Sequence, residues 1–327
     1  MRAVTYEGAG DPGVIRIAEV AAPQPGSDDA QVAVAYAGLN RADILERKGH
    51  YPSPLGPGAI PGLEFSGIVR AIGANVKAVA VGDRVCGLVP GGAHAELLVT
   101  NAQTLAPVPA GLSLEAAAAL PEAFLTAHDA LFARGNFALG QTVLIHAVGS
   151  SVGLAAIALA HDAGGTTIGT SRTPEKLERA MGHGLDTAIV LDDAWPERVR
   201  AATGGRGVDL VLDFIGAPIL EANIGLLVTG GRIVHIGTLG GNKGTFALGP
   251  LMAKRASMIG TVLRSRPLDE RIALARVFAT RLSPLFARGA LRPEIDRVVP
   301  LERVAEAHQA MEDNANFGKI LIAINPE

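Results

Sequence analysis

The segment from Gln141 to Gly164, QTVLIHAVGSSVGLAAIALAHDAG, restricts the possible fold of this chain more than any other. Its first half, Thr142 to Val148, is a short β-branched apolar run that predicts a buried parallel strand. Its second half, from Ser150, is rich in Ala and Leu and predicts a helix. Small residues fill the turn between the two, namely Ala147, Gly149, Ser150, Ser151 and Gly153. Such a turn lets a pyrophosphate approach the backbone at the helix N-terminus, although serines replace glycines of the usual G-x-G-x-x-G pattern.

Strands and helices alternate regularly around this segment, from about residue 141 to residue 263. The candidate strands are TVLIHAV, TTIGTS, TAIVL, DLVLDFIG, GRIVHIG and SMIGTVL. This alternation predicts a parallel, doubly wound sheet that binds ligands at the carboxyl ends of its strands. Residues 1 to about 120 contain short strands separated by Gly, Pro and Asn turns, and residues 267–327 mix helices and strands. We expect this tail to pack on the N-terminal domain, and the length of 327 residues favours two domains.

Composition excludes several classes of function. A single cysteine, Cys86, excludes an intramolecular disulfide and a multi-cysteine metal site, and fits a reducing cytosol. The eight histidines form no H-x₃-H pair, so no metal is expected. A net charge of −3 without a Lys/Arg block argues against nucleic acid or an anionic membrane as partner. The N-terminus begins like a strand and no apolar run reaches the ~20 residues of a membrane span, so we expect a cytoplasmic protein.

The end of the second candidate strand indicates which nicotinamide cofactor is used. A cofactor without a 2′-phosphate usually meets an Asp or Glu about 20 residues past the turn. Here the chain has Ser171 and Arg172, with Lys176 about one turn into the next helix. A hydroxyl and two cations suit a phosphate, which favours NADPH over NADH. The alternative is an ordinary helix start, with Thr173 as N-cap and Pro174 in the first turn.

Two further strand ends carry small residues. The fourth strand ends in Asp213-Phe214-Ile215-Gly216 and the fifth in Ile236-Gly237-Thr238, where a ribose and nicotinamide could lie across the sheet edge. Both could equally be plain strand-to-loop glycines. No G-x-S-x-G motif occurs, and Cys86 lies in an apolar strand pattern typical of packing rather than of a reactive thiolate.

The chain resembles the zinc-free quinone oxidoreductase branch of the medium-chain dehydrogenase/reductase superfamily over nearly its whole length. The motifs that carry the resemblance are LNRADILERKGHYPSP, PGLEFSGIV, LPGGAHAELLVT, LPEAFLTAHDALF, IHAVGSSVG, LDFIG and VLRSR. Where the zinc alcohol dehydrogenases have a cysteine ligand, this chain has the region around Asn40. Where they have Gly-His-Glu, it reads Gly62-Leu63-Glu64, and their four-cysteine lobe is absent.

The resemblance implies an α/β protein of two domains. A GroES-like, mostly β catalytic domain would comprise residues 1–121 and 265–327, and a Rossmann domain with a doubly wound parallel sheet residues 122–264. The active site would lie in the cleft between them. The family usually dimerises through edge strands of the Rossmann sheets, so a homodimer or a dimer of dimers is expected, with SMIGTVL as the edge.

The resemblance also implies a set of site residues. Asn40 and Tyr51 resemble residues beside the nicotinamide and substrate, and Ser150 is the third polar group of the catalytic site. Thr126 resembles the residue that contacts the carboxamide. The pyrophosphate would be held by Gly149, Ser150, Ser151 and Val152. Looser matches to cofactor-cleft segments are Phe214, Gly237, Leu263, Ser265, Gly318 and Lys319. Asp43 and Glu64 are expected to support structure rather than catalyse.

The expected function is metal-free, NADPH-dependent reduction of a small quinone or activated carbonyl. Reduction of a quinone needs a hydride from the nicotinamide and a proton that solvent can supply, so positioning is the main task of the protein. One alternative is enoyl-thioester or enone reduction, since related enoyl reductases carry a similar Asn…Asp…Gly-x-Tyr-Pro segment with a proton-donating tyrosine. Another is a non-catalytic NADPH-binding protein, and Tyr51 could merely pack in its proline-rich loop.

Overall fold

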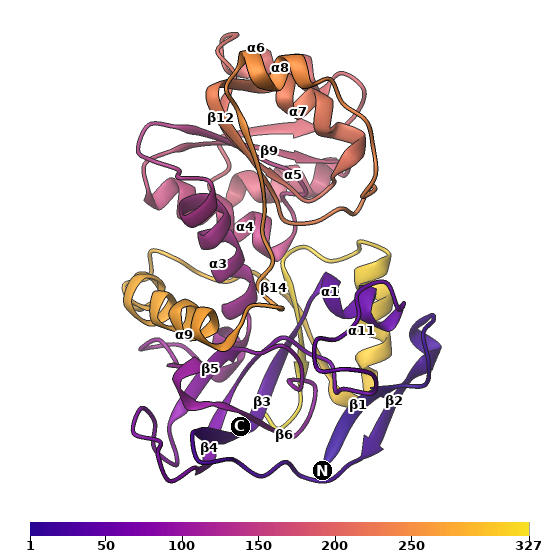
Figure 1. The fold of residues 1–327 in the computed structure, drawn as a ribbon, viewed down its shortest axis with the longest axis vertical. Helices are drawn as coiled ribbons and strands as arrows, with labels where there is room; N and C mark the ends of the chain where they lie inside the picture. Colours follow the sequence, from indigo (N-terminus) through magenta and orange to yellow (C-terminus); the bar gives the residue numbers. More distant parts are fainter. Residues whose placement is uncertain (327) are drawn as a thin grey trace. The chain divides into compact units, whose positions relative to one another are not determined.

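The computed structural model describes residues 1–326 and divides into two compact units (Figure 1). The first unit comprises Met1–Leu125 and the segment from Leu263 onward, and the second comprises Thr126–Val262. Both units combine helices with strands, so the α/β fold class is confirmed. The domain boundaries expected from the sequence, at 121/122 and 264/265, differ from this division by a few residues and stay predictions.

The main sheet of the first unit has seven strands within the described residues. Their spatial order is β14 (Ile295–Pro300), β15 (Lys319–Ala323), β3 (Asp29–Leu39), β4 (Glu64–Ile72), β5 (Arg84–Leu88) and β7 (Leu105–Pro107), with β6 (Leu97–Asn101) paired to β3. The last strand of the chain, β15, pairs antiparallel with β3, so that Leu321 lies opposite Gly38. The C-terminal tail therefore completes the sheet that the N-terminal residues begin.

Helices of the first unit cover this sheet or connect its strands. They are α1 (Arg41–Arg47), α2 (Leu114–Ala118), α9 (Leu268–Val277), α10 (Ser283–Ala287) and α11 (Val304–Glu312), with 3₁₀ turns η1 (Pro12–Val14), η2 (Ala102–Thr104) and η6 (Leu301–Arg303) and the π-helix η5 (Phe278–Leu282). Helix α3 (Pro121–His128) carries the chain from the first unit into the second and continues as the π-helix η3 (Asp129–Arg134).

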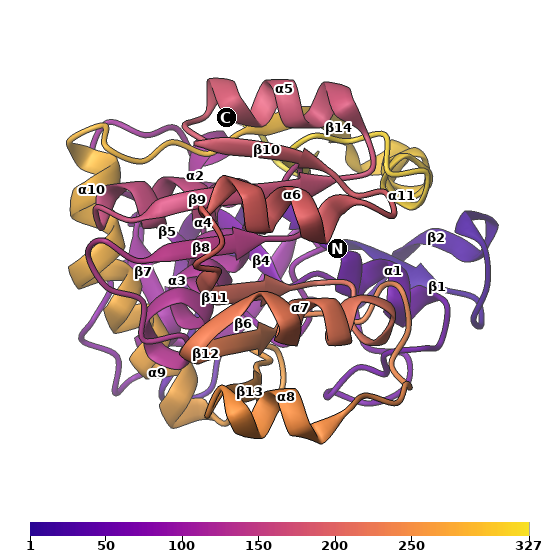
Figure 2. The same ribbon diagram turned by 90° about the horizontal axis from the view of Figure 1, so that it is seen from above.

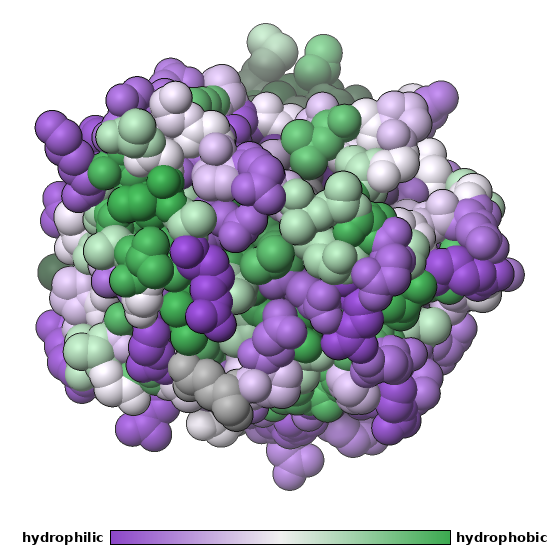
Figure 3. Space-filling model, turned by 90° about the horizontal axis from the view of Figure 1, so that it is seen from below, coloured by the Kyte–Doolittle hydropathy of each residue, from purple (hydrophilic) through white to green (hydrophobic). Residues whose placement is uncertain are grey.

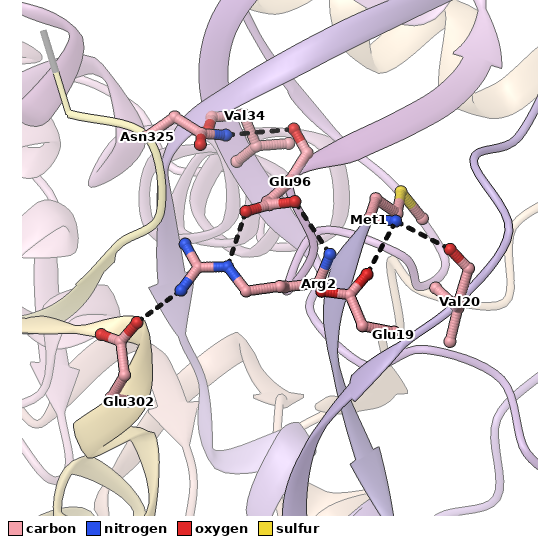
Figure 4. A network of polar contacts seen from close by, with 8 residues as sticks. All are labelled: Met1, Arg2, Glu19, Val20, Val34, Glu96, Glu302 and Asn325. Atoms are coloured by element: carbon pink, nitrogen blue, oxygen red, sulfur yellow. Dashed lines mark hydrogen bonds and ion pairs between the residues drawn. The ribbon is translucent and has the colours of Figure 1, made fainter.

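A separate antiparallel pair, β1 (Arg2–Tyr6) and β2 (Ile15–Glu19), opens the chain. Figure 4 shows how its start is held. The Met1 ammonium donates to the Val20 carbonyl at 2.9 Å, and the Arg2 side chain contacts Glu96 at 2.7 Å and Glu302 at 2.6 Å. Exposed ion pairs of this kind contribute little stability. Their role here is to join three segments that are distant in sequence.

The second unit is built on six parallel strands, again counted over the described residues. Figure 2 shows them side by side in the order β10 (Thr187–Val190), β9 (Thr166–Ser171), β8 (Thr142–Ile145), β11 (Val208–Asp213), β12 (Leu227–His235) and β13 (Ser257–Gly260). The intervening helices are α4 (Ser151–Asp162), α5 (Pro174–Gly182), α6 (Trp195–Ala202), η4 (Ala217–Ile219), α7 (Leu220–Leu226) and α8 (Leu248–Ala253). The order reverses between β8 and β11, and the crevice at such a reversal is where doubly wound folds bind ligands.

The central strands of this sheet are apolar because helices cover both faces. Val143, Leu144 and Ile145 of β8 are completely buried, as are Val211 and Leu212 of β11. The predicted strand TVLIHAV ends three residues early, at Ile145. The next residues form the turn into α4, where Ala147 has a positive φ of 50° that no strand accommodates.

Over residues 1–326, no helix combines the length and the hydropathy required to span a bilayer. On the face drawn in Figure 3, apolar side chains form several groups separated by hydrophilic ones.

Candidate cofactor and substrate site

The turn from β8 to α4 has the geometry of a phosphate-binding helix start. Ser150 is the N-cap of α4, and its Oγ accepts a hydrogen bond from the Gly153 N–H at 3.1 Å. The first main-chain bond of the helix runs from the Leu154 N–H to the Ser150 carbonyl. The N–H groups of Ser151 and Val152 precede that bond and have no acceptor within the helix. They are the donors that an anion at this end of the helix would use.

Gly153 makes the close approach of helix and turn possible. A Cβ at this position would lie 2.7 Å from the Val148 carbonyl oxygen and 2.9 Å from that of Ala147. Both are backbone atoms that cannot rotate away, so only glycine fits. The resulting cradle of small residues and free N–H groups fits the pyrophosphate of a dinucleotide.

The end of β9 presents the residues predicted to select the cofactor. Ser171 is the last residue of the strand and is almost buried, and its Oγ accepts from the Thr173 N–H at 3.1 Å. Arg172 is exposed, and Lys176 lies in the first turn of α5. The side chain of Thr173 makes no capping hydrogen bond, although Pro174 opens the helix. The ordinary helix-start explanation therefore accounts for Pro174 better than for Thr173.

Arg172→Ala is expected to weaken NADPH binding about ten- to a hundredfold, because a hydrogen bond to a charged group contributes roughly 1.5–3 kcal/mol. NADH binding should hardly change, since NADH has no 2′-phosphate. Titration of both cofactors against wild type and variant measures the two effects. Equal losses for NADPH and NADH would contradict the role given to Arg172.

The adjacent ends of β11 and β12 carry the other predicted cofactor residues of the second unit. Phe214 follows β11 and is almost buried, and Gly237 lies two residues after β12. Gly216 has a φ of 90°, and a Cβ there would lie 2.5 Å from the Gly241 carbonyl oxygen. That glycine is therefore required by the loop itself. Thr126 belongs to α3 rather than to these loops, and it is buried.

In the first unit, Asn40 belongs to a buried ionic cluster that the sequence did not reveal. Asn40 Nδ2 donates to Glu64 Oε1 at 3.0 Å, and Lys319 Nζ donates to Asn40 Oδ1 at 2.7 Å and to Glu64 Oε1 at 2.5 Å. The Glu122 N–H binds the other Glu64 oxygen at 2.8 Å. Lys319 is 1% exposed. In this placement Lys319 supports the Asn40 amide, and the place of Lys319 in the cofactor cleft stays a prediction.

Tyr51 lies against a buried arginine. The Arg264 guanidinium carbon is 5.4 Å from the centroid of the Tyr51 ring, a cation–π distance. Arg264 is itself held by the Pro90 carbonyl at 2.9 Å and by Glu46 at 2.5 Å. Burial raises the pKa of the Tyr51 hydroxyl, and the Arg264 charge partly offsets that rise. Leu263 and Ser265, which flank Arg264, were predicted from the sequence, whereas Arg264 was not, although it is the first arginine of the motif VLRSR.

The remaining predicted residues of the first unit are Leu263, Ser265 and Gly318. Leu263 is almost buried and Ser265 is exposed. Gly318 has a φ of 88°, and a Cβ there would lie 2.4 Å from the Glu294 carbonyl oxygen. The structure thus brings Asn40 and Lys319 together, and it places the predicted second-unit residues other than Thr126 and Lys176 at or just after strand ends of one sheet. The roles of all these residues stay predictions.

Metal and thiol chemistry find little support in the described residues. Within residues 1–326, no three His, Cys, Asp or Glu side chains are grouped in a way that could hold a metal ion. Cys86 is completely buried, and burial together with the Glu64 charge raises the pKa of its thiol to about 12. Such a thiol is not a ready nucleophile.

Two family models match the chain, an alcohol dehydrogenase GroES-like domain over residues 26–110 and a zinc-binding dehydrogenase domain over residues 151–279. Quinone oxidoreductase-like protein 2 of Rattus norvegicus is 30% identical over 312 residues, which are 95% of this chain and 89% of that protein. A solved NAD-dependent alcohol dehydrogenase has a TM-score of 0.90 at 32% identity, covering 99% of both chains. Escherichia coli quinone oxidoreductase complexed with NADPH has a TM-score of 0.89 at 28% identity, covering 99% of this chain and 100% of that one. With a GroES-like first unit and a parallel Rossmann-type sheet in the second, this chain belongs to the quinone oxidoreductase branch of the medium-chain dehydrogenase/reductase superfamily.

Proposed function

We propose that this protein is an NADPH:quinone oxidoreductase that transfers a hydride from the nicotinamide to a small quinone or activated carbonyl without a metal. The observation that carries the proposal is the β8–α4 turn, where Gly153 leaves room for a pyrophosphate, together with Ser171 and Arg172 at the end of β9. Family membership supports a nicotinamide cofactor and an oxidoreductase. Ser150, in place of the middle glycine, is a feature by which the chain also resembles the p53-inducible quinone oxidoreductase.

The cofactor supplies the hydride, and the residues of this chain bind and orient it. The Ser151 and Val152 N–H groups would hold the pyrophosphate, with the hydroxyl of Ser150 as a further donor. Arg172 and Ser171 would bind the 2′-phosphate. A quinone oxygen that gains charge during hydride transfer needs a donor, and water can deliver the proton.

Tyr51 is the group proposed to donate to that oxygen. The Arg264 guanidinium lies 5.4 Å from the centroid of the Tyr51 ring, and the contacts with Pro90 and Glu46 hold that guanidinium in place. For a quinone, one hydrogen bond is the whole contribution of the hydroxyl. For an enoyl thioester, the second candidate substrate, the same hydroxyl would be the general acid. The observation that favours this second candidate is the same cation-supported phenol in the Gly-x-Tyr-Pro segment.

Tyr51→Phe separates these two reactions. For a quinone reductase we expect kcat/KM to fall about five- to thirtyfold, as the loss of one hydrogen bond predicts. For an enoyl reductase the loss of a general acid would cost about 10²–10⁴-fold. NADPH oxidation with a panel of quinones, enones and enoyl thioesters measures both.

A matched control is available in Tyr6, whose buried hydroxyl makes no hydrogen bond within residues 1–326. Tyr6→Phe removes the same atom without breaking a hydrogen bond and should leave kcat/KM unchanged. If Tyr51→Phe loses more than a thousandfold, in an enzyme whose wild type prefers the thioester, the enoyl reductase is the correct function. A wild type that binds NADPH and oxidises it with none of these acceptors supports a non-catalytic binding protein.

A further inference from the structure

A chain of buried polar side chains crosses the second unit beneath the proposed cofactor loops. His146 Nδ1 lies 2.7 Å from Thr170 Oγ1, and His146 Nε2 lies 2.9 Å from Asn223 Oδ1. Asn223 Nδ2 makes a longer contact of 3.5 Å with Asp213 Oδ2, and His235 Nδ1 lies 3.1 Å from the same oxygen. Thr170, His146, Asn223 and Asp213 are all completely buried.

Four of these polar side chains lie at or next to strand ends, and each of the four is adjacent to one predicted cofactor loop. His146 lies between β8 and the phosphate turn, and Thr170 immediately precedes Ser171 at the end of β9. Asp213 ends β11 and His235 ends β12. The fifth member, Asn223, belongs to α7, and its side chain contacts His146 and Asp213. These side chains therefore link four strand ends, and the His146–Asn223 contact alone joins residues that are 77 positions apart in the sequence.

Asp213 fixes the loops after β11 and β12 by direct bonds. Its Oδ1 accepts from the N–H groups of Ile215 at 2.7 Å and Gly216 at 2.9 Å. Its backbone carbonyl accepts from the Gly237 N–H at 3.3 Å. Burial opposes ionisation, but the bonds from His235, Gly216 and Ile215 outweigh it, and the pKa of Asp213 is lowered. An ionised carboxylate here holds the backbone that flanks Phe214.

The hydrogen-bonding pattern assigns one arrangement of protons to these buried polar side chains. An ionised Asp213 only accepts, so the Asn223 amide nitrogen faces it and the amide oxygen faces His146. His146 must then carry its proton on Nε2, which leaves Nδ1 to accept from the Thr170 hydroxyl. Burial lowers the pKa of His146, in agreement with a neutral ring, and Trp195 covers that ring edge-on at 5.2 Å.

We propose that Thr170, His146 and Asn223 are positioning residues that couple the 2′-phosphate end of the cofactor site to its nicotinamide end. These hydrogen bonds fix the spacing of strand ends that must contact one cofactor molecule at several points. Because these ends are already ordered before the cofactor binds, binding does not lose the conformational entropy of ordering them. This inference rests on the cofactor-binding part of the proposed function and not on the substrate.

Thr170 allows a test with matched variants on one strand. Thr170→Val removes the hydroxyl without changing shape, and Thr170→Ser keeps it. Thr167→Val is the control, because Thr167 is also a completely buried β9 threonine and its hydroxyl is also hydrogen-bonded, donating to the Asp186 carboxylate at 2.8 Å and accepting from the Asp186 N–H at 3.1 Å. We expect Thr170→Val to weaken NADPH binding about three- to tenfold, the loss of one hydrogen bond. Thr170→Ser and Thr167→Val should bind NADPH like the wild type, even where Thr167→Val lowers the melting temperature as much.

Coupling is tested at Asn223 with a probe for one end of the site. Asn223→Leu should weaken binding of adenosine 2′,5′-bisphosphate, which contains only the 2′-phosphate half, by about three- to tenfold. In the Thr170→Val/Asn223→Leu double variant, the loss should be clearly smaller than the product of the single losses, because both act through His146. Calorimetric titration measures each affinity, and thermal unfolding confirms that each variant is folded.

The wild type provides a test that needs no variant. Nitrogen-15 NMR of the His146 ring should show a protonated Nε2 and an unprotonated Nδ1 throughout the range of about pH 5–8 in which ordinary histidines titrate. The opposite tautomer or a charged ring would overturn the proton arrangement. Equal NADPH affinities for Thr170→Val and Thr167→Val, or strictly multiplicative losses in the double variant, would overturn the coupling. A wild type that binds NADPH but reduces no acceptor refutes the proposed reaction and leaves this inference intact, whereas one that binds no dinucleotide refutes both.

Discussion

Lys319→Met is expected to lower the free energy of unfolding by about 3–5 kcal/mol, because it leaves a buried carboxylate without its cation. Lys319 is 1% exposed and Glu64 is completely buried, so water cannot replace the lost partner. The Asn40 amide oxygen loses its bond from the ammonium at the same time. Urea unfolding of wild type and variant measures the difference.

A double variant distinguishes the unpaired charge from simple loss of packing. Lys319→Met combined with Glu64→Gln removes both charges and should recover much of the lost stability, since replacing a whole buried pair is often close to neutral. Arg303→Met breaks the exposed pair with Glu306 and should leave the melting temperature unchanged. If Lys319→Met is as stable as the wild type, Glu64 is not a buried carboxylate that depends on this lysine.

Asp43→Asn is expected to change how stability depends on pH. Asp43 is completely buried, and burial raises its pKa from 3.8 to about 7, against the opposing bond from the Asn40 N–H and the charges of Arg264 and Lys319. Between these two pKa values the native state holds a proton that the unfolded state has released. The stability that this group contributes is therefore present below about pH 4 and is lost as the pH rises toward 7.

The variant lacks this titration, so its stability should rise relative to the wild type by about 1.4 kcal/mol for each pH unit across that window. The Asn40 N–H keeps an acceptor in the asparagine, which makes the substitution mild. Urea unfolding at a series of pH values gives both curves, with the exposed Asp11→Asn as control for the loss of a carboxylate. A constant difference between Asp43→Asn and wild type from pH 4 to 7 would show that Asp43 does not titrate in this window.

The fold class and the elements of the second unit were predictable because their signals are local. The strand TTIGTS coincides with β9, and the helix after the small-residue turn is α4, capped by Ser150 within the predicted turn. A strand covered on both faces must be apolar, and a helix that starts close to a strand must begin with small residues. Neighbours in sequence suffice to show either pattern. The assignment of Ser171 and Arg172 to a phosphate follows from the same locality and stays a prediction.

The sequence by itself thus determined an α/β chain with a parallel sheet, a phosphate-type turn on its first strand and no carboxylate after its second. The tertiary structure alone decided which distant polar groups share a buried space. Lys319 meets Asn40 from 279 residues away, and His146 meets Asn223 from 77 residues away. No period or motif links such positions, because the contact depends on how the strands are ordered in a sheet and not on spacing along the chain. Burial then decides the chemistry, since a lysine, a histidine or a carboxyl in the interior must find a partner or give up its charge.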